Sequence, residues 1–522
     1  MEVKKLILLL LVLVFIWGCS TGNGTNSQGG QGTEKPAASD NATIKEKDPK
    51  PLPEGKNAHV VVIGTEIEGM YLARAAKDEG LSVLVLDPRE KPGGQLIQGE
   101  MLFLDEPTDD AQKTMTQGRI KKLFDRFKKG EIRNIEHFTT YFNEVMDGIP
   151  LEPGITIVDV KKETDDKNGR TKVSGLTYKT AAGEEKTVTA DYFVENTDFT
   201  ALTHLLGGKR LPGVETIFNA PDVDYMASSI MMKFKGVDWN KFKSEVMALG
   251  KEERFEKYGG ETTVTDTFTW GFGNVGQEYE STRDDIFLRG LNALNQLNGE
   301  VLINALLIYD VVPSDNERIA EAVKLGQEET DLIVDHLRDM LPGWENAEVN
   351  GYPDYLYIRD FDRYETDYIL QATDVMGGEM FWDNVSIASY PLDNQGIKSS
   401  PWGVGLGNPD KYGMPLRSFI LKDYANVIVA GKNVGATAAA YGSARIQANT
   451  SLAGEVIGII LAQIDGEKQL VELNEEDMKK MHAYLKKEYK INVSSVKAKN
   501  KIADYTDAER EQLNSGKQVT KK

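Results

Sequence analysis

The hydrophobic positions of the chain alternate between strand and helix patterns near its start. An apolar, β-branched run from His59 to Ile63 predicts a buried parallel strand. A helical pattern follows from Met70 to Lys77, and Gly80 is placed to end it. A second apolar run, Ser82–Leu86, predicts another strand. This order of strand, helix and strand predicts a βαβ unit, and therefore an α/β fold with a parallel sheet.

Two regions further along show regular patterns of their own. Three short β runs separated by turn residues, Ile155–Val160, Val173–Lys179 and Lys186–Val194, predict a small antiparallel layer. Apolar residues then recur at helical spacing from Asn316 to Met340, which predicts a long amphipathic helix. This helix falls within residues 205–410, which we assign to an inserted α+β substrate domain.

The last part of the chain returns to the first pattern. Asn426–Ala430 predicts a short buried strand, and Gly431–Gly442 predicts a loop of small residues. A helix is expected to begin at about Ser443. Beyond it, Glu475–Tyr489 and Thr506–Leu513 predict two more helices, the second opened by a capping box.

The first twenty residues have the pattern of a targeting signal. Lys4 and Lys5 precede an apolar run from Leu6 to Ile16, which is too short to span a bilayer and suits a signal peptide. The segment I-W-G-C that follows resembles a bacterial lipobox and ends at Cys19, the single cysteine of the chain. We expect a lipid anchor at Cys19 and a place on the extracytoplasmic side of a bacterial cell membrane. A signal anchor or a plain secretory peptide is the alternative.

Composition narrows the classes of function. The chain of 522 residues carries a net charge of −20, which argues against nucleic acid as a partner because nucleic-acid binding needs a basic surface. One cysteine excludes a disulfide framework and a cysteine-rich metal site. The five histidines are scattered without HxH or HxxxH spacing, so we expect no metal centre.

The turn after the first strand has the spacing of a dinucleotide-binding loop. In G-T-E-I-E-G, Gly64 frees the turn, Gly69 lets helix and strand approach, and Asp87 lies where it could accept ribose hydroxyls. Glu66 replaces the middle glycine, at the position where a diphosphate should pass. We therefore expect its carboxylate to turn away or to be neutralised by a Lys or Arg. A βαβ unit that binds no nucleotide is the alternative.

A glycine pair follows Asp87 at a short distance. Gly93 and Gly94, in E-K-P-G-G-Q-L, would expose backbone N–H groups to a phosphate. A flexible loop without a ligand is the alternative interpretation.

Six segments in order, over about residues 57–463, resemble the FAD-dependent oxidoreductase family related to fumarate-reductase and succinate-dehydrogenase flavoproteins. They include "IRDFDRYETDYIL", "NVSIASYPLD", "LRDMLPGW" and "GMPLRSFIL". The C-terminal signature resembles "AGR…SAT…GSIRV…G.AAG" at Ala430, Gly431, Lys432, Ala436, Thr437, Gly442, Ser443, Arg445, Gly454 and Gly458. One segment departs from the family: "VENTDFTALT" has Asp198 where a glycine is usual and Phe199 where an aspartate is usual.

The resemblance implies FAD as the cofactor and a set of residues that contact it. These are Gly64, Thr65, Glu66, Gly69, Asp87, Pro88, Gly93, Gly94, Gln95, Asp198, Gly431, Gly442 and Ser443. It also implies a Rossmann-like FAD-binding domain in two parts, with a substrate domain inserted between them. The predicted organisation is a signal peptide (1–18), a disordered tether (19–56), the FAD-binding domain (57–204 and 411–466), the substrate domain (205–410) and a helical C-terminal extension (467–522).

Four arginines are candidates for the substrate site, because an arginine beside a flavin can anchor a carboxylate or polarise a carbonyl. Arg359, Arg363 and Arg445 are taken as catalytic candidates and Arg417 as a further one; structural salt bridges are the alternative role for each. The sequence thus predicts a membrane-anchored, extracytoplasmic FAD-dependent oxidoreductase with a small organic substrate and an unknown electron acceptor. A flavin- or ligand-binding lipoprotein without turnover, or a degenerate flavoprotein fold, remains the alternative.

Overall fold

The computed structural model describes residues 46–519. The predicted signal peptide and Cys19 lie outside this range, as does most of the predicted tether. Within it, no helix combines the length and the apolar character needed to cross a membrane. The last part of the predicted tether lies against the folded body: the N–H groups of Lys47 and Lys50 donate to the carbonyls of Asp78 and Gly80, both at 2.8 Å.

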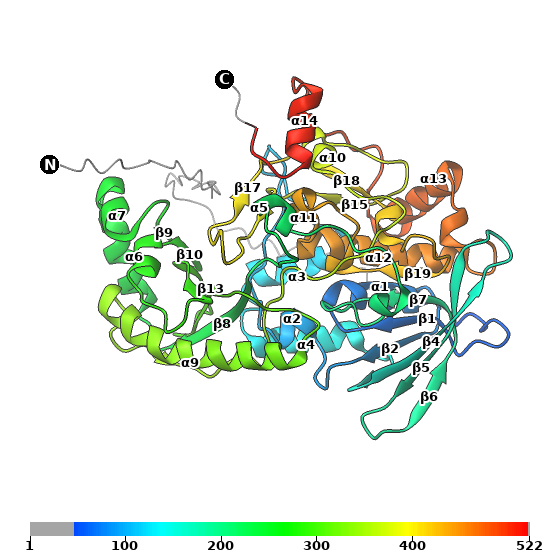
Figure 1. The fold of residues 1–522 in the computed structure, drawn as a ribbon, viewed down its shortest axis with the longest axis horizontal. Coiled ribbons are helices and arrows are strands. Elements are labelled where there is room, and N and C mark those ends of the chain that lie inside the picture. Colours follow the sequence, from blue (N-terminus) through cyan, green and yellow to red (C-terminus); the bar gives the residue numbers. More distant parts are fainter. Residues whose placement is uncertain (1–45, 520–522) are drawn as a thin grey trace, which may run out of the picture.

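A five-stranded parallel sheet forms the centre of the dinucleotide-binding region (Figure 1). Its strand order is β19-β7-β1-β2-β3, and all its pairs are parallel. The strands are β1 (Ala58–Ile63), β2 (Val83–Asp87), β3 (Leu151–Pro153), β7 (Ala190–Glu195) and β19 (Val427–Val429). β1 is completely buried, as its continuous apolar run predicts for a strand with both faces covered. The predicted α/β fold class is confirmed.

Two helices from opposite ends of the chain pack against each other beside this sheet. α1 (Ile67–Asp78) follows β1, whereas α12 (Gln447–Ile464) follows β19 (Figure 1). A Cβ added at Gly454 or Gly458 of α12 would lie under 3.0 Å from the backbone oxygen of Glu68 or Leu72. Gly454 and Gly458 therefore allow the close packing of these two helices. Further helices near the sheet are α2 (Gly94–Ile97), α3 (Gly118–Lys128) and α4 (Ile135–Met146).

The small antiparallel layer is present, with one change. β4 (Thr156–Thr164), β5 (Thr171–Lys179) and β6 (Glu185–Val188) form a three-stranded sheet. The run predicted as one strand, Lys186–Val194, is interrupted at Thr189, and its second half is β7 of the parallel sheet. The interruption lets one stretch of chain serve two sheets.

The substrate region has its own antiparallel sheet and its own hydrophobic core. α9 covers one side and spans Asn316–Met340, the same residues that the periodicity predicts. The other helices here are α5 (Glu215–Phe218), α6 (Trp239–Ala248), α7 (Lys251–Tyr258) and α8 (Gly273–Gln277). The strands are β8 (Ser228–Lys235), β9 (Thr263–Val264), β10 (Phe268–Gly271), β11 (Ile286–Leu288), β12 (Leu291–Asn295), β13 (Val301–Ile308) and β14 (Glu348–Val349).

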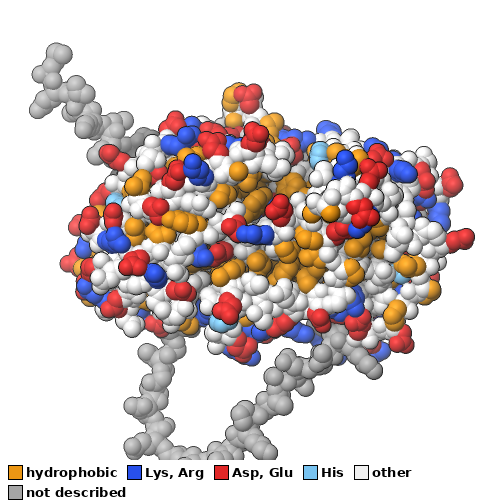
Figure 2. Space-filling model, turned by 90° about the horizontal axis from the view of Figure 1, so that it is seen from below, with side chains coloured by type: hydrophobic (Ala, Val, Ile, Leu, Met, Phe, Trp, Pro, Cys, Tyr) orange, Lys and Arg blue, Asp and Glu red, His pale blue; other side chains and the backbone are white. Residues whose placement is uncertain are grey.

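The rest of the chain closes over the sheet and ends in short helices. It includes α10 (Ala372–Gly377), the pairs β15 (Asn384–Ala388) with β18 (Tyr412–Pro415) and β16 (Asp393–Asn394) with β17 (Val404–Gly405), and α11 (Ala438–Ala444). α13 (Glu475–Tyr484) is shorter than predicted, because Leu485–Tyr489 winds as a π-helical turn; α14 (Asp507–Asn514) has the predicted Thr506 capping box. Figure 2 shows apolar side chains gathered in the middle of one face, among charged side chains of both signs.

Candidate functional site

The turn between β1 and α1 is fixed by an asparagine from a neighbouring strand. Gly64 has φ +92°, and a Cβ there would lie 2.5 Å from the backbone oxygen of Asn196. The Asn196 side chain donates to the carbonyls of Gly64 (3.2 Å) and Glu66 (2.8 Å), and it accepts from the N–H of Gly69 (3.0 Å). Both predicted glycines therefore stand where the backbone needs them. Asn196, just after β7, was not singled out from the sequence, although its segment was noted.

Asp87 ends β2 as predicted, with its carboxylate turned into the protein. It accepts from the Thr65 hydroxyl and from the N–H of Arg89 (2.9 Å), and burial raises its pKa. The Thr65 hydroxyl oxygen in turn accepts from the N–H of Gly93 (2.7 Å). Thr65, Asp87 and Gly93 thus form one hydrogen-bonded group with Pro88 beside it. Whether Asp87 contacts a ribose stays a prediction.

Glu66 points into the same region and is 3% exposed. Both of its carboxylate oxygens accept from the N–H of Gln95 at 3.1 Å, and Arg89 approaches one of them to 3.4 Å. A Cβ added at Gly94 would collide with this carboxylate. Of the two outcomes expected for Glu66, the structure therefore shows pairing with an arginine rather than a turn outward.

Asp198 completes this group from the loop after β7. It is fully buried, forms an ion pair with Arg89, and lies 3.8 Å from the Lys432 ammonium. The Arg89 guanidinium lies 4.0 Å from the centre of the Tyr355 ring, which belongs to the substrate region. Lys432 also donates to the Gln95 side chain (2.7 Å). We call Glu66, Arg89, Asp198 and Lys432 the buried ion cluster.

A dinucleotide diphosphate does not fit at this turn in the described conformation. The glycine pair was expected to expose backbone N–H groups to a phosphate, but the N–H of Gly93 is bound to the Thr65 hydroxyl, and that of the next residue after the pair, Gln95, is bound to the Glu66 carboxylate. A second carboxylate, that of Glu68, lies in the same space and within 3.4 Å of a Cβ added at Gly431. Burial first, and the neighbouring Glu66 second, raise the pKa of Glu68 to about 7. The position that a diphosphate needs is thus filled by acidic side chains of the chain itself.

A second polar group lies where the sheet region meets the substrate region. Arg359 is buried, donates to the carbonyl of Ala227 (2.8 Å) and the side chain of Asn304 (3.1 Å), and stacks 4.4 Å above the Tyr357 ring. The Arg445 guanidinium donates to the Tyr357 hydroxyl (3.2 Å). Tyr357 therefore lies between two of the predicted catalytic arginines.

A small cavity opens beside this group. Its volume is about 20 Å³, and its lining includes Gln95, Asp105, Tyr357 and Arg445. A ligand site of ordinary size has ~300–1,000 Å³. Arg445 Nε, at the cavity, is buried and has no hydrogen-bond partner among the residues that the structure describes. The site offers an unsatisfied polar atom, but it is closed to a cofactor.

The remaining predicted residues lie apart from this cavity. Arg363 is buried, donates to the carbonyl of Ala436 (2.7 Å) and lies over the Tyr441 ring, 3.6 Å from its centre. Gly442 and Ser443 are inside α11 rather than at the end of a loop, because helix begins at Ala438 with Thr437 as its cap. Ser443 donates to the Tyr390 carbonyl (2.7 Å), a structural contact.

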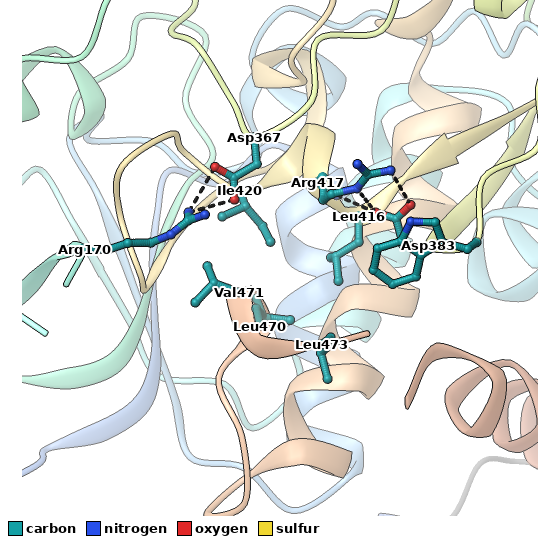
Figure 3. Close-up of a pocket in the computed structure, with 10 residues that line it drawn as sticks. Arg170, Asp367, Asp383, Leu416, Arg417, Ile420, Leu470, Val471 and Leu473 are labelled. Carbon is teal, nitrogen blue, oxygen red and sulfur yellow. Dashed lines mark hydrogen bonds and ion pairs between the residues drawn. The ribbon is translucent and has the colours of Figure 1, made fainter. Parts of the chain in front are cut away.

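Arg417 does not reach the site. It forms an ion pair with Asp383 (2.9 Å) at the edge of a separate surface cavity of about 260 Å³. Figure 3 shows this pair, with Arg170 and Asp367 as a second pair, above apolar side chains that include Leu416 and Leu470. Arg417 has the structural role that was its alternative.

Sequence reasoning missed Arg89 and Lys432 as parts of the buried ion cluster. It also missed Tyr357, Asp105 and Arg289 in the second group, where Arg289 donates to the Gln395 side chain and its charge acts on Arg359. Lys432 lies in the C-terminal signature, but nothing local to Arg89, Asp105, Arg289 or Tyr357 shows what they meet.

Comparison with known proteins gives a family match. The model of a family described as FAD dependent oxidoreductase matches residues 59–485. A search of curated proteins finds no match. Among solved structures, the chain resembles a geranylgeranyl bacteriochlorophyll reductase-like protein from Thermoplasma acidophilum (14% identity, 89% of this chain and 93% of that chain, TM-score 0.35). It also resembles tetracycline destructase Tet(51) (10%, 89% and 98%, 0.38) and flavin-dependent brominase Bmp2 (12%, 82% and 83%, 0.37). These structural likenesses are remote and decide nothing about the reaction.

Proposed function

Because the chain belongs to the FAD-dependent oxidoreductase family, we propose that it acts on a small organic anion at the boundary between the sheet and substrate regions, and does so on the outer side of a bacterial membrane. The class of enzyme and the cofactor, FAD, are those that the sequence predicts. One observation carries the substrate class: among the described residues, Arg289, Arg359 and Arg445 lie together and none of them forms an ion pair with a carboxylate.

Arg359 has the environment of an anion-binding group. Burial, together with the nearby positive charges of Arg289 and Arg445, lowers its pKa to about 10. A buried guanidinium with only neutral partners is costly, and a bound carboxylate would relieve that cost through paired, charge-assisted hydrogen bonds. An anionic substrate therefore suits this site better than a neutral one.

Asp105 supplies a group that can exchange a proton with the substrate. Burial, and secondly the charge of Asp393, raise the pKa of Asp105 to about 6, while Arg445 and a hydrogen bond from Tyr390 act in the opposite direction. A group that titrates near neutral pH is suited to general acid–base catalysis. In this proposal the arginines bind and orient the anion and Asp105 holds or releases the proton; FAD, when bound, would supply the redox chemistry.

The test uses FAD-loaded protein without oxygen. A panel of small carboxylates and matched neutral amides is added while flavin absorption is followed. We expect bleaching with at least one carboxylate, and a rise of KM of tenfold or more in Arg359→Met, with Arg417→Met as the control at an ion-paired surface arginine. Bleaching by the amides alone, or an unchanged KM in Arg359→Met, would overturn the substrate class. Calorimetric titration of FAD-free protein with the same carboxylates tests the anion site by itself.

The location rests on the lipobox-like segment and Cys19. Cys19→Ala should abolish lipid labelling and release the protein from membranes, or block its maturation; retained labelling would end this part of the proposal. Within the family, we place the chain near the fumarate-reductase and succinate-dehydrogenase flavoproteins, and the six segments that occur in order support this placement.

A further inference from the structure

The buried ion cluster joins parts of the chain that a bound dinucleotide would separate. Glu66 precedes α1, Arg89 follows β2, Asp198 follows β7, and Lys432 follows β19. All four positions are at the carboxyl ends of parallel strands, the edge at which doubly wound sheets bind dinucleotides. Tyr355 adds a contact from the substrate region, because its hydroxyl donates to Asp198 at 3.4 Å. The cluster therefore closes the dinucleotide edge with direct contacts.

The four side chains that define the cluster carry equal numbers of opposite charges, and Glu68 and Asp87, both with a raised pKa, are two further acidic groups beside it. Glu66 and Asp198 supply two carboxylates, and Arg89 and Lys432 supply two cations; the exposed fractions of these side chains are 4%, 0%, 12% and 3%. A diphosphate would add two negative charges to this closed space. Repulsion between charges this close is strong in a buried setting, so a diphosphate and the two carboxylates cannot share it. Arg89 and Lys432, by contrast, are the residue types that bind phosphate.

We infer that the buried ion cluster is an internal plug: in the FAD-free chain, the carboxylates of Glu66 and Asp198 take the place of the FAD diphosphate on Arg89, Lys432 and the Gln95 N–H. The plug holds the FAD-free chain folded. FAD enters only when Glu66 leaves, and Arg89 and Lys432 then exchange a carboxylate partner for a phosphate. This inference concerns cofactor uptake and does not depend on the proposed substrate or location.

The plug has a signature that an ordinary stabilising contact lacks. Removing the Glu66 charge takes away a partner of Arg89 and of the Gln95 N–H, so the FAD-free protein should melt at a lower temperature. The same change removes the competitor of the diphosphate, so FAD should bind more tightly. A contact with a purely structural role would lower both stability and affinity.

The experiment measures both quantities on FAD-free protein. Glu66→Gln is compared with wild type by thermal unfolding and by titration with FAD, with Asp354→Asn as the control, since Asp354 is an exposed acid paired with Lys91 outside the cluster. In Glu66→Gln, we expect the affinity for FAD to rise tenfold or more and the melting temperature to fall. In the control Asp354→Asn, we expect both quantities to stay at their wild-type values. Affinity that is unchanged or reduced overturns the plug, whatever happens to the melting temperature.

A kinetic measurement on wild type covers the case in which Glu66→Gln does not fold. FAD fluorescence is followed after rapid mixing with FAD-free protein at increasing FAD concentrations. If the plug must open first, the observed rate levels off at an opening rate that FAD does not change. A rate that rises linearly with FAD throughout, with submicromolar affinity, overturns the inference.

Discussion

The packing of α1 on α12 gives a prediction whose size follows from the structure. Gly458→Ala places a methyl group under 3.0 Å from the carbonyl oxygen of Leu72. The backbone of α12 fixes the position of the methyl carbon, and the oxygen belongs to the backbone of α1, so no rotamer change can relieve the contact. The two helices must therefore separate. Overpacking of this kind typically costs about 1–3 kcal/mol, and the upper part of that range applies because the partner is backbone. Alanine recovers about 1 kcal/mol through its better helix propensity.

The net expectation is that the free energy of unfolding falls by about 1–2 kcal/mol. Urea unfolding followed by circular dichroism measures it, with Gly377→Ala in α10 as the control. A Cβ at Gly377 meets nothing within 4 Å, so this substitution should be neutral or stabilising by up to about 1 kcal/mol. If Gly458→Ala proves as stable as wild type while Gly377→Ala behaves as expected, the close approach of the two helices is wrong.

Three further predictions concern buried charge. Asp87→Ala should weaken FAD retention by ~1.5–3 kcal/mol, the value of hydrogen bonds to a charged acceptor; equal FAD occupancy in mutant and wild type would place Asp87 away from the adenosine. Glu68 has a pKa raised to about 7, so the folded state holds its proton between about pH 4.5 and 7 where the unfolded state has lost it. The free energy of unfolding should therefore fall by up to about 3 kcal/mol as the pH rises through that range. In Glu68→Gln, unfolding measured over the same pH range should not show this decrease. Arg119→Met leaves the buried Glu455 without its cation, whereas Asp78 keeps its pair with Arg74, so urea unfolding should show a loss of about 3–5 kcal/mol; a loss below ~1 kcal/mol, as at exposed pairs, would contradict the buried pairing.

Local patterns predicted the elements well where a single signal dominates. The helix Asn316–Met340 was found residue for residue, because its apolar stripe is long and Asp315 caps it. The loop expected over Gly431–Gly442 was wrong in its second half. Three consecutive alanines, Ala438–Ala440, favour helix, and the Thr437 hydroxyl accepts a hydrogen bond from the Ala440 N–H. The run of small residues predicts a loop, but the alanines and the Thr437 cap within that run favour helix, and they decide the structure.

The site was harder to predict because its contacts are distant in sequence. Only the turn and its glycines could be predicted from spacing, since each glycine is required by the local backbone geometry. The inward orientation of Glu66 depends on Arg89 and on Asp198, which lies 109 residues beyond Arg89. Arg359 and Arg417 look alike as candidates. The Arg359 guanidinium ends on the Ala227 carbonyl and the Asn304 side chain in the interior, whereas that of Arg417 ends on Asp383 at the surface, a difference decided by tertiary packing.

β19 and α12 come from the last part of the chain and pack beside the first βαβ unit, which affects how the chain folds during synthesis. Until residues from 427 onward have been synthesised, β7 lacks its outer neighbour β19, and α1 lacks α12, the helix on which it packs most extensively. Pairings between segments so far apart form slowly, because the intervening loop must close first. During synthesis from the N-terminus, β1, α1 and β2 are therefore made long before β19 and α12. The apolar surface that β19 and α12 cover stays exposed until almost the whole polypeptide has been synthesised. Truncation even a short way into α12 should give an insoluble product rather than a smaller folded protein.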